Sequence, residues 1–212
     1  MLPCAVAEGN PMPVEPNPTS TLGLLERIRA GDEAAFSTLF SKYSPRLSVF
    51  IHYRLSPEMR NRVEVDDILQ ETFLAASRQL GNFTYRNPGS FMSWTSRIAD
   101  HIIVDTARRE GRQKRRAELV RFKTESNPQG AEAVDSTTPS RIFAGRERVE
   151  QVLKRLDALP EDYRQVVLLA KIEGLSMGET AGRLGISREN AAVLLHRAIQ
   201  RLREMERQAE RE

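Results

Sequence analysis

Apolar residues recur at helical spacing through most of this chain, and no segment alternates apolar and polar residues as a strand does. The clearest stripe lies between residues 65 and 76, where apolar side chains return every three or four positions. Its members are Val65, Ile68, Leu69, Thr72, Phe73 and Ala76. Similar spacing predicts helices from Thr21 to Gly31, from Asp32 onward, and from Phe91 into a basic stretch. The pattern therefore predicts an all-α protein.

Polar residues, prolines and glycines indicate where these helices begin and end. Asp32 is suited to cap the second helix, because its short side chain can accept a hydrogen bond from a free backbone N–H group. Pro45 and Pro57 are expected to interrupt the chain between that helix and the stripe at 65–76. Residues 81–89 contain two glycines, two asparagines and a proline, and this composition predicts a loop.

The C-terminal part of the chain carries the pattern of a helix-turn-helix. Ser176 and Glu179 have the spacing of a capping box at the start of a short helix. Gly185 then allows a tight left-handed turn, and Ser187 can cap a longer helix. The second helix of such a motif reads bases in the DNA major groove near its N-terminal end. A capped helical hairpin that does not bind DNA would show the same short pattern.

Changes in composition divide the chain into four parts. Residues 1–20 are rich in proline and are predicted to form a disordered tail, and residues 21–116 a first helical domain. Residues 117–145 carry few apolar side chains and many small, polar and acidic ones, so we expect a flexible linker there. Residues 146–212 form a second helical domain that contains the helix-turn-helix.

Charge and cysteine content exclude several classes of function. The formal net charge is only +3, so any nucleic-acid surface must come from local clusters of cations. One cluster stands out in the first domain, consisting of Arg108, Arg109, Arg112, Lys114, Arg115 and Arg116. The single cysteine, Cys4, rules out an intrachain disulfide framework, and three widely spaced histidines give no metal site. We also expect no catalytic site and no cofactor, because no nucleophile–base arrangement or phosphate-binding loop stands out.

The chain shows no targeting or membrane segment. No apolar run approaches the ~20 residues that a membrane-spanning helix needs. The N-terminus lacks the basic start and apolar core of a signal peptide. We therefore expect a cytoplasmic protein.

Three segments together resemble extracytoplasmic-function sigma factors, which are promoter-recognition subunits of bacterial RNA polymerase. Residues 156–203 resemble the domain that binds the −35 promoter element. Residues 66–73, DDILQETF, resemble the polymerase-binding helix of the family. Residues 91–109, FMSWTSRIADHIIVDTARR, resemble the helix that contacts the −10 element. The three segments follow the family's order, so the resemblance is far more specific than any one motif.

The resemblance implies a set of contacts for each segment. The polymerase-binding residues, on the helix that docks on the β′ subunit of core polymerase, are Asp66, Asp67, Gln70 and Glu71. The candidates for the −10 element are Phe83, Tyr85, Arg97, His101, Arg108, Arg109 and Arg112. Among these, Phe83 and Tyr85, together with Phe91, could stack on an unpaired base. The candidates for the −35 element are Ser187, Arg188, Asn190, His196, Arg197 and Arg201. Trp94 has the spacing of a core residue, and Asp105 is expected to order a neighbouring arginine.

The last helix departs from the family pattern. Ala192 and Leu194 stand where the family usually has a lysine and an arginine, and Val193 replaces a small polar residue. His101 and Thr95 also differ from the usual asparagine and leucine. The recognition helix is therefore less basic than expected, and fewer phosphate contacts mean weaker binding with a flatter salt dependence.

Two other functions remain open at this stage. One is a helix-turn-helix regulator that binds its operator without polymerase, which would leave residues 66–73 and 91–109 unexplained. The other is an adaptor or anti-regulator that binds polymerase or a sigma partner without reading DNA. The apolar pair Ala192 and Val193 favours this function. The resemblance also suggests core RNA polymerase (β′ and β subunits), promoter DNA and an anti-sigma factor as partners. It further suggests that the two halves of the free protein pack together and hide their DNA-binding surfaces.

Overall fold

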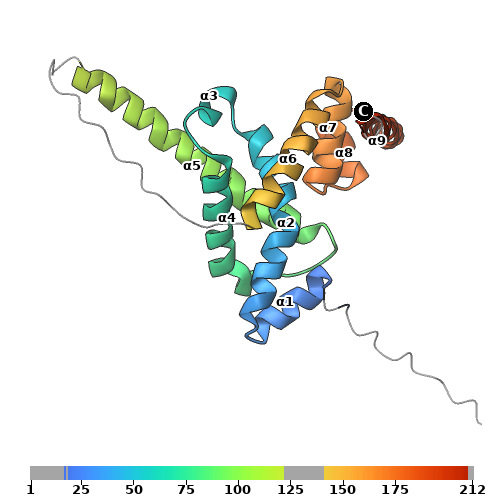
Figure 1. The fold of residues 1–212 in the computed structure, drawn as a ribbon, viewed down its shortest axis with the longest axis horizontal. Coiled ribbons are helices and arrows are strands. Elements are labelled where there is room, and N and C mark those ends of the chain that lie inside the picture. Colours follow the sequence, from blue (N-terminus) through green and yellow to red (C-terminus); the bar gives the residue numbers. More distant parts are fainter. Residues whose placement is uncertain (1–16, 18, 122–140, 210–212) are drawn as a thin grey trace, which may run out of the picture. The chain divides into compact units, whose positions relative to one another are not determined.

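The computed structural model describes residue 17, residues 19–121 and residues 141–209, with side chains given up to Arg112 and again from Arg146 (Figure 1). All regular secondary structure in these ranges is helical, as predicted. The elements are α1 (Thr21–Arg29), α2 (Glu33–Arg54), α3 (Pro57–Arg60), α4 (Val65–Gln79), a 3₁₀ turn (Leu80–Asn82), α5 (Ser90–Arg121), α6 (Arg141–Asp157), α7 (Glu161–Val167), a π-helical turn (Leu168–Ile172), α8 (Met177–Leu184) and α9 (Arg188–Ala209).

The chain divides into two compact units, residues 1–39 and residues 40–212. In the first unit, α2 begins where predicted, because the Asp32 carboxylate accepts a hydrogen bond from the Ala35 backbone N–H at 3.2 Å. The buried apolar residues of α1 are Leu24 and Leu25. Leu22 and Ile28, which recur at helical spacing with Leu25, keep some exposure.

Pro45 does not interrupt the chain, contrary to the prediction. It lies inside α2, which continues to Arg54. A proline removes one backbone N–H donor and crowds the preceding turn. Buried side chains on both sides of it, Tyr43 and Leu47, hold the helix in the core, so packing outweighs this local cost. Pro57, in contrast, lies beyond the end of α2, as expected, and it begins the short helix α3 after the cap Ser56.

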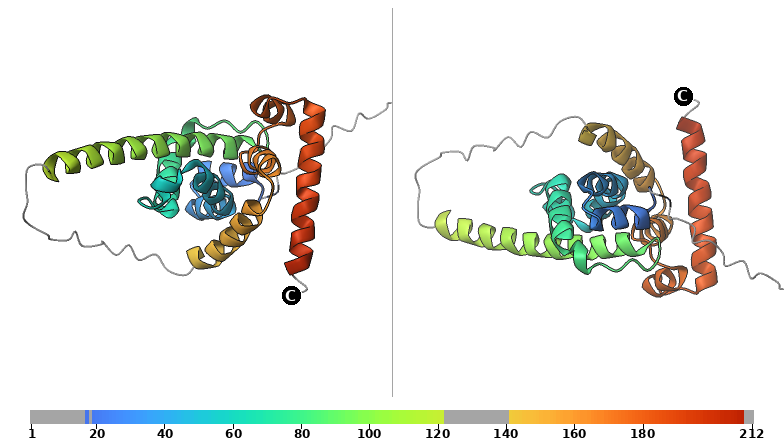
Figure 2. Two further views of the ribbon diagram at one scale, coloured as in Figure 1. Left: turned by 90° about the horizontal axis from the view of Figure 1, so that it is seen from above. Right: turned by 90° about the horizontal axis from the view of Figure 1, so that it is seen from below.

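Helices α4 and α5 pack along each other in the second unit. Ile68, Thr72, Phe73 and Ala76 of α4 are buried, as predicted, whereas Val65 and Leu69 of the same stripe keep some exposure. In both views of Figure 2 the last part of α5 runs beyond the helices that it packs against. The helix reaches Arg121, five residues past the predicted end of the first domain. The basic end of α5 is thus carried away from the core.

The C-terminal helices, α6 to α9, form their core together with α2. The buried members of this shared core are Val49, Leu156, Leu159, Val166, Val167, Leu168 and Ala198. Val49 comes from the middle of α2, and Tyr53, one turn later, packs against the same cluster. The C-terminal helices therefore rest on α2 within a single compact unit. Most of the predicted linker, residues 122–140, lies outside the described residues.

Candidate polymerase and nucleic-acid interfaces

The four predicted polymerase-binding residues lie together on α4 and form what we call the acidic ridge. Asp67, Gln70 and Glu71 are exposed, and Asp66 is half-buried. They lie on the side of α4 away from its buried stripe, because the helical period separates the two faces. Asp66 and Asp67 also occupy the first helical turn, where the helix dipole favours negative charge. The exposure of this polar face agrees with the sequence pattern, and its role in binding polymerase stays a prediction.

Two features of the acidic ridge were not evident from the sequence. Asp66 forms an ion pair with Arg146 of α6, so a C-terminal helix already occupies one of its charges. Leu74 is 52% exposed and lies one turn beyond Gln70 and Glu71, which adds an apolar side chain to the end of the ridge. The exposure of Leu74 could have been predicted from its position outside the buried stripe of α4. An apolar residue at such a position does not by itself indicate function.

The cations of α5 face solvent. Arg97, His101, Arg108, Arg109 and Arg112 are all exposed. Asp105 lies 3.6 Å from Arg108, which confirms that this carboxylate orders a neighbouring arginine. The side chains of the remaining predicted cations, Lys114, Arg115 and Arg116, lie outside the described residues. The described part of the cluster is free to meet a polyanion along an exposed helix.

Phe83 is a core residue, and the prediction that it offers a free ring to a base is wrong for this structure. It is 6% exposed and lies 4.8 Å from the Trp94 ring and 5.6 Å from the Phe91 ring, measured between centroids. Phe91 is 2% exposed and packs in the same cluster, whose aromatic contacts outweigh the polar loop around Phe83. Tyr85 is half-buried and remains the candidate stacking residue.

The helix-turn-helix has the predicted local geometry. The Ser176 backbone N–H donates to the Glu179 carboxylate at 2.9 Å, and the Glu179 N–H donates to the Ser176 hydroxyl at 3.3 Å, which completes the capping box. The Ser176 side-chain hydrogen bond, then its backbone bond and the nearby Arg97, lower the pKa of Glu179. Gly185 has φ +67°, the left-handed conformation that the turn requires.

The predicted −35 residues all lie on the exposed surface of α9 or at its cap. Ser187 accepts a hydrogen bond from the Asn190 backbone N–H at 3.1 Å and begins the helix. Arg188, Asn190, His196, Arg197 and Arg201 are exposed, and Arg201 lies 3.5 Å from Glu204. On the opposite face, the stripe that packs into the core includes Ala191, Leu194, Leu195, Ala198 and Leu202.

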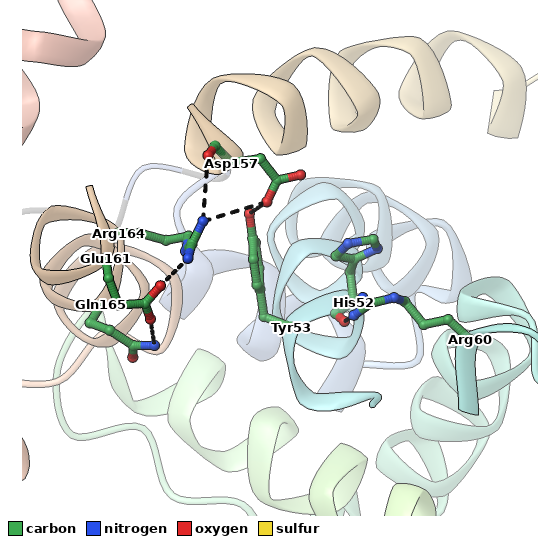
Figure 3. A network of polar contacts seen from close by, with 7 residues as sticks. All are labelled: His52, Tyr53, Arg60, Asp157, Glu161, Arg164 and Gln165. Carbon is green, nitrogen blue, oxygen red and sulfur yellow. Dashed lines mark hydrogen bonds and ion pairs between the residues drawn. The ribbon is translucent and has the colours of Figure 1, made fainter. Parts of the chain in front are cut away.

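A polar network joins α2 to the C-terminal helices (Figure 3). The Tyr53 hydroxyl donates to Asp157 at 2.6 Å, and Arg164 approaches the same carboxylate at 3.9 Å. Burial and the hydrogen bond to Asp157 raise the pKa of Tyr53 well above its ordinary value. Nearby, the half-buried Arg46 donates to the Ile172 carbonyl at 3.0 Å. These contacts fix the C-terminal helices on α2 at several points.

The C-terminal helices share a core with α2, but this packing does not hide the predicted DNA-binding residues. The covered surface is that of α2, around Val49 and Tyr53. The candidates on α9, and those on α5 from Arg97 onward, stay exposed. Beside this contact lies a pocket of about 300 Å³ whose charged lining residues are Arg54, Glu173 and Arg183. Burial raises the pKa of Glu173, and the two arginines oppose that rise.

The described part of the chain offers neither a cluster of metal ligands nor a membrane-spanning helix. No three histidine, cysteine or acidic side chains there are placed to hold a metal ion. None of the helices in those ranges is long and apolar enough to cross a membrane.

Comparison with known proteins decides the family. The sequence pattern of the ECF sigma factor family matches residues 19–210. The chain belongs to the ECF sigma factor family. Its relatives include the RNA polymerase sigma factor CarQ of Myxococcus xanthus, 31% identical over 85% of this chain and 94% of that protein. The ECF RNA polymerase sigma factor SigE of Mycolicibacterium smegmatis is 30% identical over 90% of this chain and 70% of its own length.

This ECF sigma factor is therefore a transcription initiation subunit that binds core RNA polymerase and directs promoter recognition. Sigma factors are not enzymes in the catalytic sense. Among solved structures, one chain of the complex of CnrH with the cytosolic domain of CnrY matches 86% of this chain and 94% of its own length. The identity is 24% and the TM-score 0.39. The assignment rests on the sequence comparisons.

Proposed function

We propose that the sigma factor docks on core polymerase through the acidic ridge of α4. The single observation that carries this proposal is that the polar side of α4 faces solvent while its apolar side is buried. Exposed carboxylates at Asp67 and Glu71 give the charge pattern that a basic partner surface would recognise and orient. Leu74 at the end of the ridge adds apolar surface that such a complex would bury.

In the same proposal, α5 and α9 divide the promoter between them. The exposed cations of α5 bind phosphates of the −10 region, and Tyr85 stacks on an unpaired base. The N-terminal end of α9 enters the major groove of the −35 element, where Arg188 and Asn190 can pair with base edges. The protein acts in the cytoplasm, has no catalytic activity of its own and needs no cofactor. An anti-sigma partner stays a prediction.

Run-off transcription with purified core polymerase on a pool of promoter fragments tests the proposal. We expect selective transcripts that disappear in Asp67→Arg, because the substitution reverses a charge at the centre of the acidic ridge. Asp162→Arg is the matched control, since Asp162 is an exposed acid in the first turn of α7, as Asp67 is in α4, and it should leave the transcripts intact. Helical content by circular dichroism checks that both variants fold.

Each other outcome has a defined meaning. Binding to core polymerase without transcripts would favour the adaptor function that the sequence left open. Specific binding to DNA in the absence of core would favour an operator-binding regulator. Equal loss of transcription in Asp67→Arg and Asp162→Arg would contradict the assignment of the ridge.

A further inference from the structure

Val193 lies at the centre of the exposed face of α9. Each residue of an α-helix advances by about 100°, so Val193 lies about 200° around the helix from Ala191. Ala191 and Ala198 are 0% exposed and mark the middle of the buried face. Val193 therefore points almost directly away from the core, and it is 50% exposed. The adjacent Leu194 packs against the core instead.

The surroundings of Val193 are polar and charged. His196 and Arg197 follow it by three and four positions, so they lie on the next turn of the same face. Glu189 lies one turn before it, and all three side chains are exposed. The Arg197 cation suits a phosphate at the edge of a groove, whereas the valine occupies the line that lies deepest when a recognition helix enters the groove.

An aliphatic side chain in the major groove has one complementary partner. Of the base edges there, thymine alone presents an apolar group, its C5-methyl. A valine against cytosine N4 or guanine O6 would remove water from a polar atom without replacing the hydrogen bond, which is unfavourable. The isopropyl group of Val193 would therefore discriminate among bases through contact with a methyl group.

We propose that Val193 is a specificity-determining residue that recognises a thymine of the −35 element through its C5-methyl group. This inference rests on the proposed function, because it needs α9 to enter the major groove of promoter DNA. It explains how a recognition helix with few cations at its centre still selects a sequence. The apolar pair Ala192 and Val193 then belongs to the DNA-reading surface and not to a protein-binding one.

The test begins with a −35 sequence selected by the full-length protein and core polymerase from duplexes randomised in that region. Each thymine of the selected sequence is then replaced in turn by deoxyuridine, which removes only the C5-methyl group. We expect one position at which this change lowers holoenzyme affinity by about fourfold, the effect of losing one buried methyl group. Replacing the same thymine by cytosine should weaken binding further, and 5-methylcytosine should recover part of that loss.

Variants connect the methyl effect to this side chain. In Val193→Ser the deoxyuridine penalty should vanish at that position, because the aliphatic partner is gone. Val104→Ser removes a valine of α5 that is 46% exposed, and should keep the full penalty. The inference is overturned if no thymine shows methyl-dependent affinity, or if wild type and Val193→Ser show the same deoxyuridine penalty, while the wild-type protein still supports transcription. Loss of core binding in Val193→Ser without DNA would also overturn it, in favour of a protein contact. Absence of any transcript in the wild type would instead mean failure of the proposed function.

Discussion

Val49→Ala tests whether the C-terminal helices are held on α2 by a shared core. Val49 is 2% exposed and packs among residues of α6, α7 and α9. The substitution removes two methyl-sized carbons from that core. At about 0.8 kcal/mol per buried carbon, with a further term for the cavity that remains, we expect a loss of about 2 kcal/mol of unfolding free energy.

Urea unfolding of the full-length protein measures this loss, and hydrogen exchange locates it. Val104→Ala is the control, because a 46% exposed valine should change stability by no more than about 0.5 kcal/mol. We also expect faster exchange of the backbone amides of α7 and α9 in Val49→Ala, since these helices lose part of their contact with α2. The reasoning is refuted if the two variants unfold at the same urea concentration, or if exchange in α7 and α9 is unchanged.

Three further predictions concern contacts of single residues. Arg146→Ala should raise affinity for core polymerase by up to about fivefold, because it frees Asp66 from a surface ion pair worth at most ~1 kcal/mol. A binding titration that gives the same affinity for the variant and the wild type would contradict this. Gly185→Ala should lower stability by about 1 kcal/mol or more in thermal unfolding, because a side chain strains the left-handed turn, whereas Gly182→Ala, in the open on α8, should not lower it. The lowered pKa of Glu179 means that its contribution to stability is present above the unfolded-state pKa and is lost as pH falls through the folded-state value. Glu179→Gln should therefore flatten the acid side of the stability profile between about pH 5 and 3, and an unchanged profile would count against the capping box.

The local features of this protein could be predicted from its sequence because they depend on residues close together in the chain. The stripe of α4 follows from the spacing of Ile68, Thr72, Phe73 and Ala76, which one helical period turns to the same side. The caps and the turn of the helix-turn-helix follow from Ser176, Glu179, Gly185 and Ser187, since each acts on a backbone group within a few residues. The polar residues of these helices are exposed because the same helical period places them on the side away from the buried residues.

Three features depended on packing that a local pattern does not contain. Pro45 stays inside α2 because the surrounding side chains are buried on several sides, which a local rule for proline does not include. Phe83, in a stretch with the composition of a loop, joins Phe91 and Trp94 because α5 passes over it. The position of Val193 at the centre of the exposed face of α9 became clear only once the buried face was known.

The sequence by itself thus determined most of the helices, their caps and the motifs that place this protein in the ECF sigma factor family. Only the tertiary structure showed that the C-terminal helices rest on Val49 and Tyr53 of α2, and that Arg146 pairs with Asp66. Helical periods and caps are set by neighbours within about one turn, and they can be read from a single segment. The partner that covers an apolar face is chosen by the packing of the whole chain, over separations of about a hundred residues that no local pattern contains.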